Sequence, residues 1–203
     1  MIELLTQILC DYPPAVAVDG AYLFAQTVDN QASVFEAGFD ILVRKQAKKL
    51  LISAAGPISG YPGYKQWQHE LHQLGINSAD VAGIPPSTEA ILHTRVEAEG
   101  LVRYLKATGA KTVSVISAPF HQLRCFMTVV SVALEEMPEL KIYSQVGTSL
   151  PWHETVVHSQ GTLQLKRSNL IKSELDRITT YQQKGDLVST EAVYDYLTRR
   201  DRD

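Results

Sequence analysis

The sequence has little cysteine and lacks any long apolar run. Its two cysteines, Cys10 and Cys125, form no CxxC pair, so they support neither a zinc site nor a thioredoxin-like motif and indicate a reducing compartment. No apolar stretch approaches the roughly 20 residues that span a bilayer. The opening segment carries Glu3 where a signal peptide carries a basic residue. We therefore expect a soluble, cytoplasmic protein with no membrane partner.

An excess of positive charge is also missing. The 203 residues include 19 basic and 22 acidic side chains, for a net charge of -3. The basic residues are scattered, and no aromatic residues alternate with them as a nucleic-acid stacking platform requires. We therefore expect no nucleic-acid partner. The hydrophobic content of 45 % is ordinary for a globular protein.

Several common ligand-binding motifs are absent. The loop GPISGYPG at 56–63 lacks the Lys-Ser or Lys-Thr of a P-loop and does not match GxGxxG. His69 and His72 lie three residues apart without a third ligand nearby, so we expect no metal. No GxSxG elbow supports a Ser-His-acid triad.

What the sequence does contain is an alternation of short apolar segments and helical patterns. Strands are predicted at 21–26, 50–53, 81–84, 112–117 and 141–146, and helices at 31–46, 64–74, 87–109, 121–137, 168–184 and 189–199. Such alternation implies right-handed βαβ crossovers and a parallel sheet. We predict an α/β, Rossmann-like three-layer sandwich with a mainly parallel five-stranded sheet. Residues 1–203 would form a single domain, with a core at 21–147 and a C-terminal helical extension at 168–200.

The expected strand order places a ligand site at the carboxyl ends of the strands. If the first three strands run outward in the order 3-2-1 and the fourth lies on the other side of the first, a switch point separates strands one and four. The segments 26–30 and 117–124 would face this crevice, flanked by the loop 53–63. Thr27, Ser53 and Gly56 are therefore candidate ligand contacts. The loop 147–167 is read as a packed surface connection rather than a lid.

The segment SAPFHQLR at 117–124 is the strongest candidate for chemistry. A strand passes directly into a helix there, so backbone amides and Ser117 would face an anionic ligand. Arg124 would add a forked donor, and His121 would act as an acid, a base or a hydrogen-bond partner. The alternative is that His121 caps the turn and Arg124 pairs with a surface carboxylate. Thr94 and Glu97 share one helix face, a spacing that is by itself typical of a solvated surface.

HTRVEA followed by SAPFHQLR resembles the YdcF, SanA and ElyC family of domains of unknown function. The matching positions are Thr94, Glu97, Ala98, Ser117, His121 and Arg124. The strand LLIS and the segment SELDRITTYQQKGDL at 173–187 extend the resemblance over most of the chain. Ala54 and Ala55 stand where the family has a glycine pair, and Gly63 stands where it has an acid, so the chain resembles a divergent member.

The resemblance implies a Rossmann-like domain that binds a small anionic or nucleotide-like ligand, with S-adenosylmethionine as a candidate cofactor. One hypothesis is an enzyme of the transferase or hydrolase type, with His121 and Glu97 as proton carriers. The ligand contacts would be Thr27, Ser53, Gly56, Thr94, Ser117 and Arg124. The other hypothesis is a non-catalytic ligand-binding or regulatory module. Whether the protein is a homo-oligomer is left open.

Overall fold

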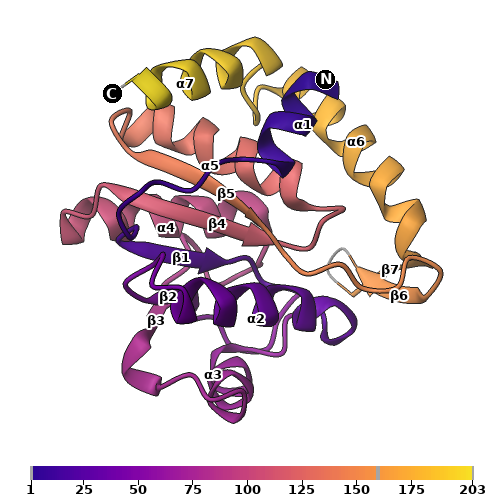
Figure 1. Ribbon diagram of the computed structural model, residues 1–203. Helices are drawn as coiled ribbons and strands as arrows, with labels where there is room; N and C mark the ends of the chain where they lie inside the picture. Colours follow the sequence, from indigo (N-terminus) through magenta and orange to yellow (C-terminus); the bar gives the residue numbers. More distant parts are fainter. Residues whose placement is uncertain (1, 159–160, 203) are drawn as a thin grey trace.

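Five parallel strands form the central sheet of the protein. The computed structural model describes residues 2–158 and 161–202, and Figure 1 shows the arrangement of the elements. The strands are β1 (Gly20–Leu23), β2 (Leu50–Ser53), β3 (Val81–Ile84), β4 (Thr112–Ser117) and β5 (Lys141–Val146). They pair in the order β3-β2-β1-β4-β5. This confirms the predicted α/β, Rossmann-like sheet and places its switch point between β1 and β4.

Helices cover both faces of this sheet. The helices are α1 (Ile2–Leu9), α2 (Val28–Val43), α3 (Tyr64–Gln73), α4 (Thr94–Thr108), α5 (Gln122–Glu136), α6 (Arg167–Lys184) and α7 (Thr190–Arg202). Successive strand residues point to opposite faces. Tyr22 accordingly packs in one apolar cluster with residues of α4 and α5, whereas Ala21 and Leu23 pack in another with residues of α2 and α3. The sequence pattern thus produces three layers.

No helix among the described residues combines the length and the apolar character that crossing a membrane requires.

The long helix α4 begins later than the sequence pattern predicts. We expected a start at Ser87, but the helix begins at Thr94 with His93 as its N-cap. The His93 ring accepts a hydrogen bond from the Val96 amide at 3.4 Å, which satisfies one free donor of the first turn. Ser87 instead donates its hydroxyl to Glu99 at 2.7 Å, beside the helix rather than at its end.

Strand β1 is shorter than predicted, ending at Leu23 rather than Gln26. The amide of Ala25 donates to the Glu97 carboxylate at 2.9 Å, so it is not available to the sheet. A side chain of α4 therefore fixes the backbone just beyond β1.

The connection at 147–167 contains a hairpin, which the sequence reading missed. β6 (Thr155–His158) and β7 (Leu163–Lys166) pair antiparallel on the side of the sheet to which the arrowheads of β1 and β4 point (Figure 1). Hydrogen bonds attach this hairpin to the start of α2. Thr27 Oγ1 donates to the Val157 carbonyl, and the Val157 amide donates to Asp29, each at 2.7 Å. The hairpin therefore lies against the carboxyl edge of the sheet.

Candidate functional site

A pocket of about 260 Å³ opens at the carboxyl edge of the sheet, and we call it the edge pocket. It is lined by Ala25, Gln26, Thr27, Ser59, Tyr61, Leu92, His93, Thr94, Glu97, His121, Arg124, His158, Arg177 and Tyr181. These residues come from the ends of β1 and β6, the loop after β2, and the helices α4, α5 and α6. The pocket thus lies beside the switch point where open parallel sheets commonly bind ligands.

Five of the eight site residues proposed from the sequence line this pocket, namely Thr27, Thr94, Glu97, His121 and Arg124. The other three do not line it. Ser117 is fully buried and its hydroxyl accepts a hydrogen bond from Gln26 Nε2 at 3.2 Å. The Ser53 carbonyl accepts one from the Tyr61 hydroxyl at 3.0 Å, and Gly56 is exposed. Ser53 and Ser117 therefore support lining residues from behind.

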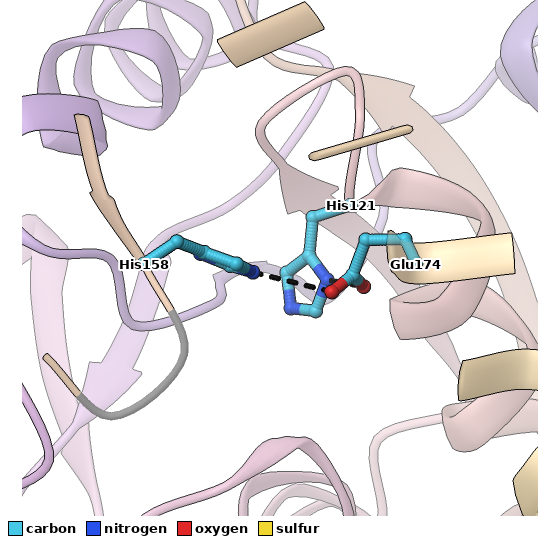
Figure 2. Close-up of side chains that lie close together, drawn as sticks. All are labelled: His121, His158 and Glu174. Atoms are coloured by element: carbon cyan, nitrogen blue, oxygen red, sulfur yellow. Dashed lines mark hydrogen bonds and ion pairs between the residues drawn. The ribbon is translucent and has the colours of Figure 1, made fainter. Parts of the chain in front are cut away.

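Glu174 of α6 is the centre of a buried polar network behind the pocket (Figure 2). Its carboxylate lies 2.6 Å from Arg124 Nε and 2.5 Å from His121 Nδ1. His158 Nε2 lies 3.2 Å away and Arg177 Nη1 lies 3.4 Å away. Only 3 % of the Glu174 side chain is exposed. A single carboxylate therefore positions four side chains that line the pocket.

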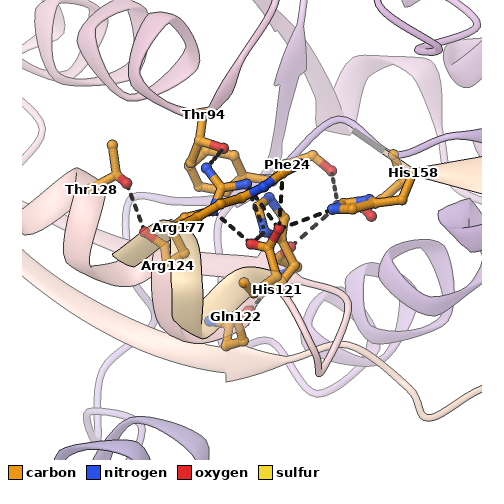
Figure 3. A network of polar contacts seen from close by, with 11 residues as sticks. Phe24, Thr94, His121, Gln122, Arg124, Thr128, His158 and Arg177 are labelled. Carbon is orange, nitrogen blue, oxygen red and sulfur yellow. Dashed lines mark hydrogen bonds and ion pairs between the residues drawn. The ribbon is translucent and has the colours of Figure 1, made fainter. Parts of the chain in front are cut away.

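Arg124 connects this network to α4. Its Nη1 donates to Thr94 Oγ1 at 2.8 Å (Figure 3). Its Nε donates to Glu174. The second N–H of Nη1 has no partner among the described residues. The alternative in which Arg124 pairs with a surface carboxylate is wrong, because its partner is buried.

The pKa values of the two buried glutamates of the site are shifted in opposite directions from the ordinary value of 4.5. Burial raises the pKa of Glu97 to about 7, since hydrogen bonds from the Ala25 amide and the Tyr22 hydroxyl offset burial only in part. Burial acts in the same direction on Glu174, but His121 and Arg124 hold the pKa of that carboxyl well below its usual range. Burial lowers the pKa of His121 to about 4, so its ring is neutral at pH 7.

The backbone amides expected to bind an anion are already occupied. The Ser117 amide donates to Gln122 Oε1 at 2.7 Å. The amides of His121 and Gln122 donate to the Ala118 carbonyl at 2.8 and 2.9 Å. These amides therefore do not form the expected anion cradle, and the positive charge of the pocket comes from arginine side chains.

His121, His158 and Glu174 are also a set of potential metal ligands, with ligand atoms all within 4.8 Å of one another. Two imidazoles and one carboxylate are a common donor set for Zn²⁺ and Fe²⁺. The guanidinium groups of Arg124 and Arg177 already contact the carboxylate, so a cation would have to displace them. In this arrangement the arginines neutralise Glu174 in place of a metal.

The sequence reading missed His158, Glu174, Arg177 and Tyr181 as residues of the site. A signal existed for three of them, because Glu174, Arg177 and Tyr181 lie at i, i+3 and i+7 and so share one face of α6. No local signal exists for His158, since it reaches the site only through the hairpin.

No family model matches the chain, and no curated protein matches its sequence. Membership of the YdcF-like family therefore stays a prediction that depends on the two motif segments.

Proposed function

We propose that the edge pocket binds a small anionic molecule and that the protein is a transferase- or hydrolase-type enzyme acting on it. The observation that carries this proposal is a buried carboxyl group, Glu97, whose pKa is near neutrality and which shares a pocket with Arg124 and Arg177. A proton carrier and an anion-binding group within one pocket are what acid–base chemistry on an anion requires.

The charge of the pocket supports an anionic ligand. Arg124 and Arg177 contribute two positive charges, which the ionised Glu174 and the partly ionised Glu97 offset only in part at pH 7. Glu174 also fixes the Arg124 fork, so the guanidinium is oriented before a ligand arrives. Arginine is suited to phosphate and carboxylate groups because its planar donors match their oxygen atoms.

Glu97 and His121 are the proton carriers in this proposal. A carboxyl group with a pKa of about 7 has both protonated and ionised forms at neutral pH, so it serves as acid or base. His121 donates its Nδ1 proton to Glu174, which fixes the tautomer and leaves Nε2 as an acceptor. Nε2 has no hydrogen-bond partner among the described residues. His121 therefore starts as a neutral acceptor, whereas Glu97 is present in both protonation states.

A non-catalytic ligand-binding or regulatory module is the second candidate. His121 and Arg124 are both hydrogen-bonded to Glu174, and structural ion-pair networks of this kind also shift pKa values without catalysing anything. In such a module the same residues would bind the anion, and Glu97 would remain a buried structural acid.

Candidate ligands include inorganic phosphate, sugar phosphates, nucleotides and S-adenosylmethionine. The volume of about 260 Å³ is small, because ligand pockets usually enclose roughly 300–1,000 Å³. The edge pocket alone therefore favours a compact anionic group over a whole nucleotide or S-adenosylmethionine.

A thermal-shift screen of these compounds tests the proposal. A ligand present at about 100 times its Kd stabilises the folded state by about 2.7 kcal/mol. We expect Arg177→Gln to reduce the shift. Lys172→Gln, which removes one positive charge from the exposed face of the same helix, should leave it unchanged. If no anion stabilises the protein, or if both substitutions act equally, the proposal is wrong.

Turnover of the stabilising compound then separates the two candidates. In an enzyme, Glu97→Gln would abolish turnover while leaving most of the binding intact. If the wild type binds the compound but never converts it or transfers a group from it, the binding module is the better description.

A further inference from the structure

A second pocket, of about 300 Å³, adjoins the edge pocket between α4, α5 and α6, and we call it the side pocket. It is lined by His93, Thr94, Arg95, Arg124, Thr128, Tyr181, Asp186 and Leu187. Four of these residues, His93, Thr94, Arg124 and Tyr181, line the edge pocket as well. The two pockets therefore share a boundary made of the same side chains.

Arg124 is the central element of this boundary. It is joined to Thr94 by a hydrogen bond of 2.8 Å, and its guanidinium carbon lies 5.9 Å from the centre of the Tyr181 ring. The Thr128 hydroxyl donates to the Arg124 carbonyl at 2.7 Å, so Thr128 follows Arg124 by one turn of α5 (Figure 3). Thr128 is buried and lines the side pocket, and we call it the floor of that pocket. A ligand held by Arg124 therefore has the side pocket directly beside it.

The side pocket differs in chemistry from the edge pocket. Thr128 and Leu187 line it and are buried. Tyr181 lines it as well, with the Arg124 guanidinium and Lys184 Nζ each 5.9 Å from the centre of its ring. The Arg95 guanidinium is engaged by Glu99, Glu135 and the Asp186 carbonyl at 2.8–3.0 Å, so its charge is already compensated. A flat, largely apolar group suits these surroundings, because it would pack against the aromatic ring and the buried aliphatic atoms.

The two volumes support a ligand that spans both pockets. Each is at or below the lower end of the roughly 300–1,000 Å³ that ligand pockets usually enclose, whereas together they fall well inside it. An anion alone would leave the side pocket without an occupant, and an apolar group alone would make no use of the arginine side chains of the edge pocket.

We infer that the ligand has two parts, an anionic group held in the edge pocket and a flat, largely apolar group held in the side pocket. This inference rests on the proposed function, because Arg124 must hold the anion for the second group to be directed into the side pocket. A phosphate monoester of an aromatic or heteroaromatic alcohol is the simplest compound of this class.

Calorimetric titration of the wild-type protein with inorganic phosphate and with phenyl phosphate tests the inference. Stacking on an aromatic side chain together with burial of the ring predicts that phenyl phosphate binds about tenfold more tightly than phosphate. Equal affinities for the two probes would overturn the inference while leaving the proposed function intact. If neither probe binds, the inference is wrong, and the thermal-shift screen of the other anions decides the proposed function separately.

A substitution in the side pocket provides a second test of the inference. Thr128→Met fills the floor of this pocket, so we expect the affinity for phenyl phosphate to fall to the affinity for phosphate. The affinity of the variant for phosphate should stay within twofold of the wild-type value. Thr179→Met makes the same change on the exposed surface of α6 and should alter neither affinity. If Thr128→Met weakens both probes equally, the substitution acts through Arg124 and the inference is wrong. Circular dichroism verifies that each variant is folded, and the comparison of probes on the wild type does not depend on either variant.

Discussion

At the scale of single residues, the two buried glutamates of the site show how neighbours decide the state of a carboxyl group. Glu97 and Glu174 are 5 % and 2 % exposed, so burial opposes ionisation of both. Glu97 receives hydrogen bonds from an amide and a phenol, whereas Glu174 contacts two guanidinium groups and two imidazoles. Positive neighbours keep Glu174 ionised, and neutral donors leave Glu97 close to its midpoint at pH 7.

Glu97→Gln should change how stability depends on pH. The pKa of Glu97 is about 7 in the folded protein against an ordinary 4.5, so the folded state binds more protons in this range. The free energy of unfolding of the wild type therefore falls as the pH rises from 4.5 to 7. Glutamine does not titrate, so the variant does not lose this free energy. Between pH 5 and pH 8 we therefore expect the free energy of unfolding of Glu97→Gln to rise relative to that of the wild type, by an amount on the order of 3 kcal/mol.

Urea unfolding at pH 5 and at pH 8 measures this difference. Glu36→Gln, at an exposed position on α2, is the control and should show no such gain. A gain of the same size in both variants would mean that the buried carboxyl is not its source.

Glu174→Ala should destabilise the protein by about 3–5 kcal/mol, because it leaves the buried Arg124 guanidinium without its counter-charge. Denaturant unfolding measures this value. Asp176→Ala, which removes an exposed partner of Lys172 two residues further along α6, should cost no more than about 1 kcal/mol. Replacing both buried partners, in Arg124→Met with Glu174→Leu, should restore much of the stability. A double variant as unstable as the single one would contradict this explanation.

At the scale of elements, the sequence predicted what depends on local pattern. The β-branched run at 112–117 and the segment at 141–146 became β4 and β5 with the predicted bounds. β4 is a short apolar run that is buried along almost its whole length, whereas β5 lies at the edge of the sheet and has buried residues at alternate positions near its start. The start of α4 and the hairpin could not be read in this way. The first depends on Ser87 meeting Glu99, and the second depends on Val157 meeting Thr27 and Asp29, far away in the chain.

The same distinction explains the candidate site. Thr94, Glu97, His121 and Arg124 were identified because they belong to two short motifs beside predicted strand ends. Glu174, the partner that His121 and Arg124 share, lies 50 residues beyond Arg124. The spacing of Glu174, Arg177 and Tyr181 puts them on one helix face, but no local pattern shows that this face meets the site.

Gly100→Ala should destabilise α4 although alanine favours helices by about 1 kcal/mol. A Cβ atom at Gly100 would lie 2.3 Å from the Pro85 carbonyl oxygen, so the helix must move away from the chain that follows β3. We expect a net loss of about 1–3 kcal/mol in urea unfolding, as for overpacked sites.

Gly38→Ala in α2 is the matched control for this substitution. The new Cβ atom would meet only the ends of the Leu23 and Leu50 side chains, at 3.1–3.3 Å, and these can move aside. Its stability should stay within about 1 kcal/mol of the wild type. Equal effects at Gly38 and Gly100 would show that contact with rigid backbone is not the cause.

At the scale of the whole molecule, the C-terminal extension predicted at 168–200 is continuous with the packing of the sheet. Leu187, Val193 and Leu197 belong to the same apolar cluster as Val113 and Val115 of β4. α1 and α7, from the two ends of the chain, both pack against α5 (Figure 1). A core limited to residues 21–147 therefore describes only part of the apolar interior.

Arg200→Met tests this link between the ends of the chain. Arg200 contacts both oxygen atoms of Asp11 at 2.7 Å, and both side chains are nearly inaccessible to solvent. Removing the guanidinium leaves the buried Asp11 carboxylate without its counter-charge. We therefore expect the free energy of unfolding to fall by about 3–5 kcal/mol in thermal or denaturant unfolding. Arg44→Met, which removes an exposed partner of Asp40, should cost less than about 1 kcal/mol. A similar small cost at both sites would show that the ends of the chain are not held by this pair.

The position of Glu174 in the chain also has a consequence for synthesis on the ribosome. His121 and Arg124 emerge 53 and 50 residues before their shared carboxylate. A nascent chain that stops before α6 holds all five strands of the sheet but has no counter-ion for the Arg124 guanidinium. Because chains grow from the N-terminus, the pocket is among the last parts of the protein to form. The proposed ligand binding would therefore distinguish chains that include α6 from chains that stop before it.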